Sequence, residues 1–361
     1  MKNFHDYSWS ERKVKIYFIK KQILLSLLLV VPLLTMAQTT YVPDDNFEAY
    51  LENNGIGDGI WGNDYVWTSA IDTLIGLYID NMGIVELIGI EDFTALKKLY
   101  CDLNGMMTNL DVSQNINLEI LNLYNNSVTS LDLSNNINLI RVHAGTNYLN
   151  FLDISGCTNL KFLACSFNQL TSLDVSGLSN LERLECNNNN ISHLDITGCT
   201  ALEELRNGGN NQNTIDVSTN INLTEILCGM DSLTHLDVSS CPNLKNIYVG
   251  MNIKLTYLNL QNGDPTGPPC NANGNPNLTC VQVNDVAYAN ANFTDFDNGV
   301  YFDLNCPPVG IEEENMAEEI LKDKTLVRIV DVLGRNVNPQ KKILLLYIYD
   351  DGSVEKKVIM D

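Results

Sequence analysis

Apolar and polar positions alternate through the middle of the chain in a pattern that repeats at a fixed interval. A motif of the form Leu-Asp-Val-Ser recurs seven times, each 21 residues after the last, and its first residues are Leu110, Leu131, Leu152, Leu173, Leu194, Ile215 and Leu236. Regular periods near this length are typical of solenoids, in which each coil buries its apolar row against the next coil. The pattern therefore predicts a mostly β solenoid with 21-residue coils, and it favours a binding function because stacked coils offer a long surface.

Each repeat has the same internal spacing, Leu-x2-Leu-x-Leu/Cys-x2-Asn-x-Leu. In one unit, the positions that recur from coil to coil are Leu160, Leu163, Cys165, Asn168, Leu170, Leu173, Val175 and Leu181. Alternate residues of Leu163-x-Cys165 point inward, as in a short β-strand. This spacing resembles the leucine-rich repeat over residues 71–260, and the resemblance implies a stack of about eight to ten coils with a strand in each.

One polar column is nearly constant between coils. It comprises Asn104, Asn126, Asn147, Asn168, Asn189, Asn210 and Asn252, with Asp231 in the same column. The resemblance implies that these side chains point inward and that their amides bond the turn backbone, which satisfies buried polar groups where the chain bends. We predict a structural role for this Asn ladder.

The segments on either side of the repeats are predicted to close the solenoid. In residues 38–70, Pro43-Asp44-Asp45-Asn46 favours the start of a short helix, with Phe47 and Leu51 on one face, so we predict a helical N-terminal cap. The spacing slips after Asn252, and residues 261–306 read as an irregular loop followed by a C-terminal cap of short strands. Residues 307–324 are acidic and are predicted to be a linker.

The first 37 residues resemble a secretory signal peptide. A basic region precedes an apolar run from Ile23 to Leu34, and small residues end at Ala37, where we place cleavage. The alternative is a membrane anchor, but the run has about 12 residues and a spanning helix needs about 20.

The last segment, 325–361, has a different pattern. Strands are predicted over 326–331, 343–349 and 354–360, with a hairpin signal at Asp351-Gly352. The strings VRIVDVLGR and LLLYIYDDGSVEKKVI resemble the C-terminal sorting domain of the type IX secretion system, which occurs in Bacteroidetes. The resemblance implies export across the outer membrane, contact with that secretion machinery, and either surface anchoring or release. The alternative is a small β end cap.

The charge balance narrows the class of partner. The chain has 22 basic and 44 acidic residues, and loss of residues 1–37 would leave 16 and 42, a net charge of −26. A strongly acidic protein is a poor match for nucleic acid or anionic lipid. No later segment is long and apolar enough to span a bilayer, so we predict a secreted or outer-surface protein.

The ten cysteines fall into columns that limit their pairing. Cys101, Cys165, Cys186 and Cys228 take the inward strand position and are predicted to be buried fillers. Cys157, Cys199 and Cys241 recur every 42 residues, about 10 Å apart, which is too far for a disulfide. Cys280 and Cys306 bracket the closing cap and are the best candidate pair, with Cys270 as a possible substitute.

Catalytic and metal-binding patterns are sparse. The four histidines are dispersed, and no GxSxG, HExxH, P-loop or CxxC motif occurs, so we predict neither an enzyme nor a cofactor. The repeated acids form one stripe: Asp111, Asp132, Asp153, Asp174, Asp195, Asp216 and Asp237. Calcium is one interpretation of this stripe. The other, which we favour, is a solvated face whose Asp and Ser side chains bond the neighbouring backbone.

Outward strand positions vary between coils while the core and Asp columns stay nearly constant. The predicted ligand-binding face comprises Tyr100, Ile120, Asn122, Arg141, His143, Phe162, Arg183, Glu185, Arg206 and Tyr248. Aromatic and Arg residues are enriched in binding hot spots, and in leucine-rich repeats the strand face is the usual ligand surface. We therefore predict recognition of a protein or polysaccharide. The alternatives are drift on an unused surface, a self-associating surface or matrix component, and a calcium-dependent adhesin.

Overall fold

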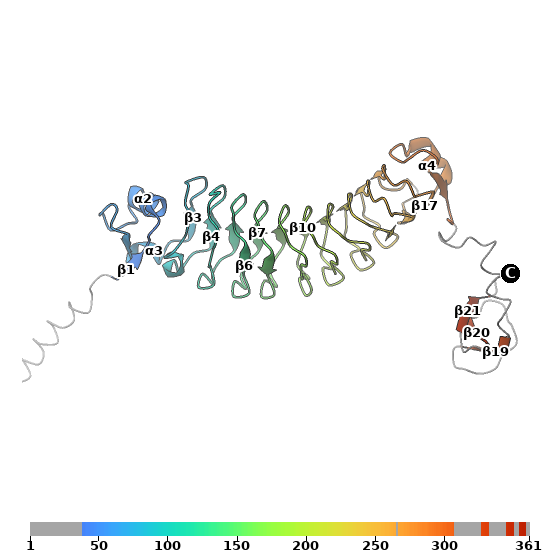
Figure 1. Cartoon of the computed structure of the whole chain (residues 1–361), viewed down its shortest axis with the longest axis horizontal. Coiled ribbons are helices and arrows are strands. Elements are labelled where there is room, and N and C mark those ends of the chain that lie inside the picture. The colour runs from blue at the N-terminus through green and yellow to red at the C-terminus, as the bar shows by residue number, and fades with distance from the viewer. Residues whose placement is uncertain (1–37, 265, 307–325, 332–343, 350–353, 359–361) are drawn as a thin grey trace, which may run out of the picture. The chain divides into compact units, whose positions relative to one another are not determined.

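The computed structural model describes residues 38–264 and 266–306, together with three later strands at 326–331, 344–349 and 354–358. The chain divides into two compact units between Cys306 and Pro307. The predicted signal peptide and linker lie outside the described residues. The first unit is an elongated β-solenoid, as predicted (Figure 1).

Ten short strands, one from each successive coil, form a single parallel sheet along the solenoid. They are β3 (Gly76–Tyr78), β4 (Lys98–Tyr100), β5 (Ile120–Asn122), β7 (Arg141–His143), β9 (Phe162–Ala164), β10 (Arg183–Glu185), β11 (Glu204–Arg206), β12 (Glu225–Leu227), β14 (Asn246–Tyr248) and β16 (Cys270–Asn271). The middle residues pair in register, with Leu99 opposite Leu121 and Leu121 opposite Val142. These middle residues are buried, so the residues on either side of them point outward.

The opposite side of each coil carries the Leu-Asp-x-Ser motif, and we call it the Asp flank. Two short parallel sheets form there, one from β6 (Ser130–Asp132) and β8 (Phe151–Asp153), the other from β13 (His235–Asp237), β15 (Tyr257–Asn259), β17 (Cys280–Gln282) and β18 (Tyr301–Asp303). Between β8 and β13 the same motif runs without strand pairing. The coils therefore have strand-like structure on two sides, with a continuous sheet on one side alone.

Strand pairing continues past residue 260, the end predicted for the repeats. β16 extends the ten-stranded sheet, and β17 and β18 extend the sheet of the Asp flank. Asn275 takes the ladder position, because its Oδ1 accepts a hydrogen bond from the backbone N of Asn252 at 2.8 Å. The extra residues between Gln261 and Pro269 are taken up in the turn between β15 and β16, so the strands keep their register.

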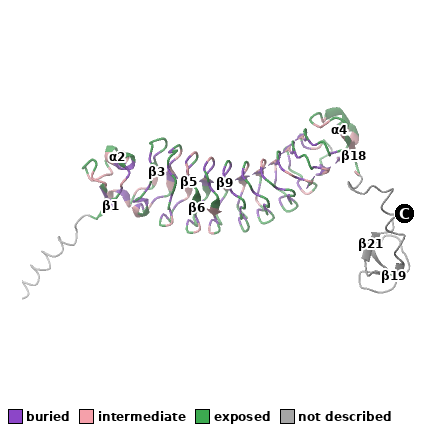
Figure 2. Cartoon of the chain, in the orientation of Figure 1, coloured by how far each residue is buried: buried purple, intermediate pink, exposed green. Residues whose placement is uncertain are grey.

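The apolar residues of successive coils join into one continuous core from the N-terminal cap to β17. Buried segments recur in every coil of Figure 2. Leu99, Leu121 and Leu163 have no exposed surface. Each such side chain contributes roughly 2 kcal/mol through burial, and it does so only because the adjacent coils cover it.

The Asn ladder joins each coil to the one before it. In Asn168, Nδ2 donates to the backbone O of Cys165 in its own coil and of Ala144 in the preceding coil, both at 3.0 Å, while Oδ1 accepts from the N of Leu149 at 2.8 Å. The other ladder asparagines also donate to a carbonyl of the preceding coil. The amide therefore satisfies backbone groups that the turn leaves buried and unpaired.

A second ladder runs along the turn that follows the Asp flank, and it uses Asn and Cys interchangeably. Nδ2 of Asn220 donates to the O of Ile196 at 3.0 Å, and Sγ of Cys241 donates to the O of Val217 at 3.6 Å. Cys199 bonds the O of Val175 in the same way at 3.5 Å. These cysteines are thus weak hydrogen-bond donors in place of an amide. Burial raises the pKa of the Cys199 thiol to about 11.

The N-terminal cap is built from β1 (Thr39–Tyr41), α2 (Asp45–Asn53), β2 (Tyr65–Trp67) and α3 (Thr68–Ile71). The Asp44 carboxylate accepts from the N of Phe47 at 2.9 Å, which caps α2, and from the N of Val85 at 2.7 Å, which fastens the cap to the first coils. The ring of Phe47 stacks on that of Phe93, just after the 3₁₀ turn η1 (Ile90–Asp92).

The C-terminal cap contains a helix that was not predicted from the sequence. We predicted short strands, and β17 and β18 are present, but α4 (Val286–Asn292) lies between them. Its start is fixed by Asp285, whose side chain accepts from the N of Tyr288. The helix was missed because its Val-Ala-Tyr-Ala-Asn sequence has no long apolar period.

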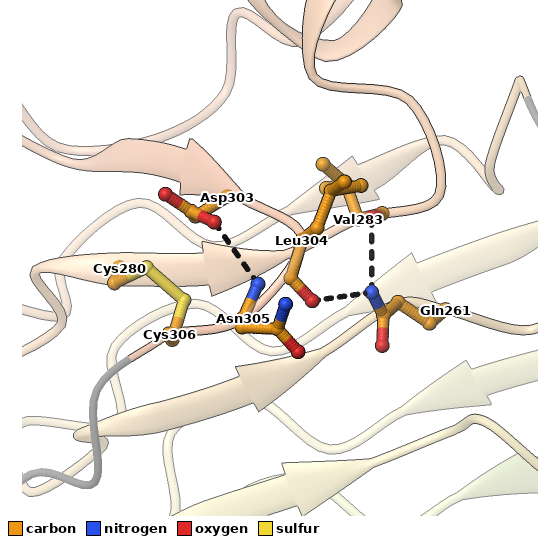
Figure 3. Close-up of a disulfide and its surroundings, with 7 residues drawn as sticks. All are labelled: Gln261, Cys280, Val283, Asp303, Leu304, Asn305 and Cys306. Atoms are coloured by element: carbon orange, nitrogen blue, oxygen red, sulfur yellow. Dashed lines mark hydrogen bonds between the residues drawn. A yellow bond between two sulfur atoms is a disulfide. The ribbon is translucent and has the colours of Figure 1, made fainter. Parts of the chain in front are cut away.

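A disulfide joins Cys280 on β17 to Cys306 after β18, with Cα atoms 5.7 Å apart (Figure 3). Beside it, Nε2 of Gln261 donates to the O of Leu304 at 2.7 Å and of Val283 at 3.2 Å. These bonds tie the last coil to the segment that covers it. The remaining eight cysteines are buried free thiols, Cys270 among them.

The second unit contains a three-stranded antiparallel sheet of β19 (Leu326–Asp331), β20 (Leu344–Tyr349) and β21 (Val354–Val358). The strands occur where the alternating pattern predicted them. The hairpin signal at Asp351-Gly352 lies outside the described residues.

Candidate binding face

The outward residues of the ten-stranded sheet form one continuous surface, which we call the main face. In-register pairing aligns one column, which reads Tyr100, Asn122, His143, Ala164, Glu185, Arg206, Leu227 and Tyr248, and a second column, which reads Lys98, Ile120, Arg141, Phe162, Arg183, Glu204, Glu225 and Asn246. The ten residues predicted as a ligand-binding face therefore lie together on the main face.

Basic residues are concentrated on this side of the coils. Of the eight Lys and Arg residues in 38–306, seven lie in the strands of the main sheet or directly before one: Lys97, Lys98, Arg141, Lys161, Arg183, Arg206 and Lys245. The same positions hold six acids, all Glu. The main face is thus close to neutral on a chain with a net charge of −22.

The part of the main face nearest the N-terminal cap is aromatic. The ring of Tyr78 stacks on Tyr100 with centroids 5.1 Å apart, and that of Tyr124 stacks on His143 at 5.0 Å. The guanidinium of Arg141 lies over the Phe162 ring at 3.9 Å from its centroid, a cation–π contact. Burial, and secondly the charge of Arg141, lower the pKa of His143, which favours its neutral form.

The next part of the main face is an ion-pair network across β10, β11 and β12. Nη1 of Arg183 lies 2.9 Å from Oε2 of Glu204, and Arg183 also pairs with Glu185 on its own strand. Nη2 of Arg206 lies 2.8 Å from Oε1 of Glu225, and its guanidinium is 3.6 Å from both Glu185 and Glu204. Two Arg and three Glu therefore share these strands with one net negative charge.

A pocket of about 310 Å³ opens beside this network. It is lined by Asn187, Asn188, Arg206, Gly208, Gly209, Leu227, Gly229, Met230 and Tyr248. Three of its lining residues, Gly208, Gly209 and Gly229, contribute no side chain, and the Tyr248 ring lies over Gly229. Gly208, Gly229 and Gly250 share one column at the 21-residue interval. A Cβ on Gly208 would come within 2.5 Å of the backbone O of Gly229, so close packing of the coils requires glycine there.

The sequence did not predict this pocket, and the predicted face did not include the stacked rings of Tyr78 and Tyr124. A signal for the pocket was present, since three glycines recur at the coil period. Tyr78 was passed over because its coil is degenerate, and Tyr124 because it lies one residue beyond the inward strand position.

The Asp flank has a different chemistry. Oδ1 of each stripe residue accepts the backbone N–H two residues later, as from Ser176 to Asp174 at 2.9 Å. Hydrogen bonds from the Ser176 side chain and backbone lower the pKa of Asp174, and Ser134 does the same for Asp132. Within the described residues, no three His, Cys, Asp or Glu side chains converge as a metal-binding group.

In the part of the chain that the structure describes, no helix has the length and apolar character needed to cross a bilayer. No family model matches the sequence, and no curated protein matches it either.

Several solved structures are similar to this chain. The functional domain of InlJ from Listeria monocytogenes, described as including a cysteine ladder, is 24% identical, with a TM-score of 0.46 over 74% of this chain and 72% of that one. Internalin C2 of the same organism is 23% identical, with a TM-score of 0.48 over 57% and 93%. The leucine-rich repeat of FLRT2, in an octameric complex with Latrophilin 3 and Unc5D, is 20% identical, with a TM-score of 0.40 over 60% and 80%. The chain is a β-solenoid of 21-residue coils whose structural neighbours are leucine-rich repeat proteins.

Proposed function

We propose that this protein is a secreted or cell-surface binding module that recognises another protein through its main face. The observation that carries the proposal is the segregation of side chains on the coils. Seven of the eight basic residues in 38–306 lie in the strands of the main sheet or directly before one, and stacked aromatic residues lie beside them. The Leu-Asp-x-Ser motifs of the Asp flank contain no Lys or Arg. A face that is rich in Arg and aromatic residues and close to neutral is typical of protein interfaces.

The ring geometry favours a protein over a polysaccharide. Sugars bind best on an exposed aromatic ring face, because the ring face offers a broad apolar platform. Here Tyr78 covers the face of Tyr100, Tyr124 covers that of His143, and Arg141 covers that of Phe162. These contacts leave fewer free ring faces for a sugar, and the mixture of rings and polar groups suits the surface of a protein.

Export is the second part of the proposal. The signal-peptide pattern in 1–37 and the resemblance of 325–361 to a type IX sorting domain support it together, because both belong to one export route. Fractionation of a bacterium that has this secretion system, expressing the chain with and without residues 325–361, tests it. We expect the full chain outside the cell or on its surface, and the truncated chain in the periplasm. Equal distribution of the two would contradict the assignment.

Protein and glycan arrays probed with the full chain test the binding proposal. Each hit is then measured with the double variant Tyr100→Ala/Arg141→Ala on the main face. The matched control is Phe151→Ala/Asp153→Ala, which removes an exposed aromatic residue and a charge from the Asp flank. We expect the main-face variant to lose at least about tenfold in affinity, as hot-spot residues do, and the control to bind normally.

Three results would count against this function. One is that binding survives the main-face variant and is lost in the control. Another is that all hits are glycans. The third is that the chain binds itself alone, which would favour a self-associating matrix component.

A further inference from the structure

One residue in each coil has a left-handed backbone conformation, directly before the ladder residue. The column is Leu103, Asn125, Thr146, Phe167, Asn188, Gly209, Met230, Met251 and Gly274, with φ between 54° and 80°. Gly and Asn adopt this conformation readily, whereas a bulky side chain there costs about 1–2 kcal/mol. Asn or Gly occupies this position in several coils, as the backbone conformation favours.

Four residues of this column also expose an apolar side chain to solvent, which is a second unfavourable feature. Leu103, Phe167, Met230 and Met251 are apolar and are 46%, 57%, 56% and 54% exposed. Neither the backbone conformation nor burial accounts for them, since neighbouring coils place Asn188 and Gly209 at the equivalent position. Strain held at an exposed apolar side chain indicates a role in contact with another molecule.

Two of the four, Met230 and Met251, lie on adjacent coils, and Met230 lines the pocket. Leu227 and Tyr248 line it too, and Met251 takes the same position as Met230 one coil further on. Methionine side chains adapt to irregular partners and contact aromatic rings favourably through sulfur. A pocket of about 310 Å³ accommodates a single large side chain.

The charged residues around the pocket determine which charge is favoured on a bound group. Arg206 is already paired with Glu225 at 2.8 Å and has Glu185 and Glu204 within 3.6 Å, so it does not offer a free positive charge to an anion. The local excess of one Glu, on a strongly acidic chain, favours a basic neighbour for the bound group. We infer that this pocket binds an aromatic side chain flanked by basic residues on a protein partner. The inference rests on the proposed function and specifies the partner's chemistry.

Methyl NMR on the full chain labelled at its methionine methyl groups tests the inference. The probe is acetyl-Lys-Trp-Lys-amide, with acetyl-Lys-Ala-Lys-amide and acetyl-Glu-Trp-Glu-amide as controls for the ring and for the charge. We expect saturable ring-current shifts at Met230 and Met251 with a Kd on the order of 1 mM for the first peptide. Binding of each control peptide should be at least about fivefold weaker, and the exposed Met106 methyl should not shift.

Substitution by the residue that other coils use gives a second, independent readout. Met230→Asn/Met251→Asn should raise Tm by about 1–3 °C through relief of strain, and it should abolish peptide binding. The matched control, Leu103→Asn, lies in the same column away from the pocket, so it should raise Tm and leave binding unchanged.

Several outcomes would overturn the inference: no saturable shift, equal shifts with all three peptides, or unchanged binding in the Met230→Asn/Met251→Asn variant. A negative result here, together with array hits that depend on Tyr100 and Arg141, would reject the pocket and keep the proposed function. Array hits that ignore the main face would reject the proposed function itself.

Discussion

The two sides of each coil share a core and a period but differ in what varies along the stack. On the Asp flank the same Leu-Asp-x-Ser pattern recurs, and each Asp accepts a hydrogen bond from its own turn. On the main face the outward residues change from aromatic to charged within a few coils. The residues of the Asp flank are therefore set by structural requirements, whereas those of the main face can vary without affecting the fold.

The difference extends to how charges are used. Stripe residues such as Asp174 bond backbone within the same coil, so their carboxylates are independent of the neighbouring coils. On the main face, Arg183 and Arg206 bond Glu residues of other strands, so the charges act as a network. Five predictions test this division, beginning with the largest expected effect and ending with the smallest.

The two ladders should differ most in stability. Asn168→Ala leaves the N of Leu149 buried without a partner, and it leaves the O of Ala144 with the longer bond from Asn147 alone, so we expect a loss of about 3 kcal/mol. Cys199→Ala removes one weak bond to the O of Val175 and should cost about 1 kcal/mol. Thermal unfolding followed by circular dichroism measures both. Equal losses would mean that the amide bonds do not set the stability of the turn.

Asp231 should give the fold an unusual pH dependence. It is an acid in the Asn ladder, its Oδ2 is buried without a hydrogen-bond partner, and burial raises its pKa to about 7. Because the folded state holds a proton that the unfolded state releases above about pH 4, stability should fall as pH rises from about 4 to about 7. Asp231→Asn should remove this loss and stabilise the protein by about 2 kcal/mol at pH 8.

Asp174, on the Asp flank, serves as a control because its pKa is shifted in the opposite direction from that of Asp231. The lowered pKa of Asp174 means that its contribution is present above about pH 4 and is lost on acidification. Asp174→Asn should therefore lower the stability by less than about 0.5 kcal/mol above pH 4 and leave it unchanged at lower pH. Melting curves between pH 3 and pH 9 separate the two residues, and a flat profile for the unmodified chain between pH 4 and pH 7 would refute the Asp231 assignment.

Removal of a network charge should exceed removal of a stripe charge. Arg206→Ala leaves Glu185, Glu204 and Glu225 together and should cost about 1 kcal/mol, with the cost reduced at high salt. Asp174→Ala should cost less than about 0.5 kcal/mol at any salt concentration. Urea unfolding at 0.05 M and 1 M NaCl compares them, and equal, salt-independent effects would show that the network charges are not coupled.

Calcium should have the smallest effect. Each stripe Asp is already bonded to its own turn, and one carboxylate per coil is far from the six to eight oxygens that calcium requires. We expect Tm to change by less than about 1 °C between EDTA and 5 mM CaCl₂. A rise of several degrees that Asp153→Asn/Asp174→Asn abolishes would restore the calcium interpretation of the stripe.

The sequence specified the periodic features of this molecule well. Coil length, inward Leu positions, the Asn ladder column and the outward Asp stripe all follow from a strict 21-residue register, because burial constrains every coil in the same way. The short helix α4 was not foreseen, since its start depends on one capping residue, Asp285, and not on a repeated pattern. The continuation of the sheets to β16 and β18 was also missed, because the loop before Cys270 changes the spacing without changing the register.

The candidate site was predictable as a surface but not as a set of contacts. Outward strand positions could be assigned column by column, so Arg183 and Arg206 were expected on one face. Their pairing with Glu204 and Glu225, and the stacking of Tyr78 on Tyr100, depend on side-chain geometry between coils, which periodicity does not encode.

The eight unbridged cysteines bear on how long the native chain can survive in an oxidising medium. Their sulfur atoms are sealed in the interior, and burial raises the pKa of thiols such as Cys199 and Cys241, so they remain unreactive while the stack is closed. Whenever neighbouring coils separate, several reactive groups are released at once within reach of one another, and a wrong crosslink would prevent reclosure. Durability in an oxidising medium is then governed by the rate at which the stack opens, more than by its equilibrium free energy.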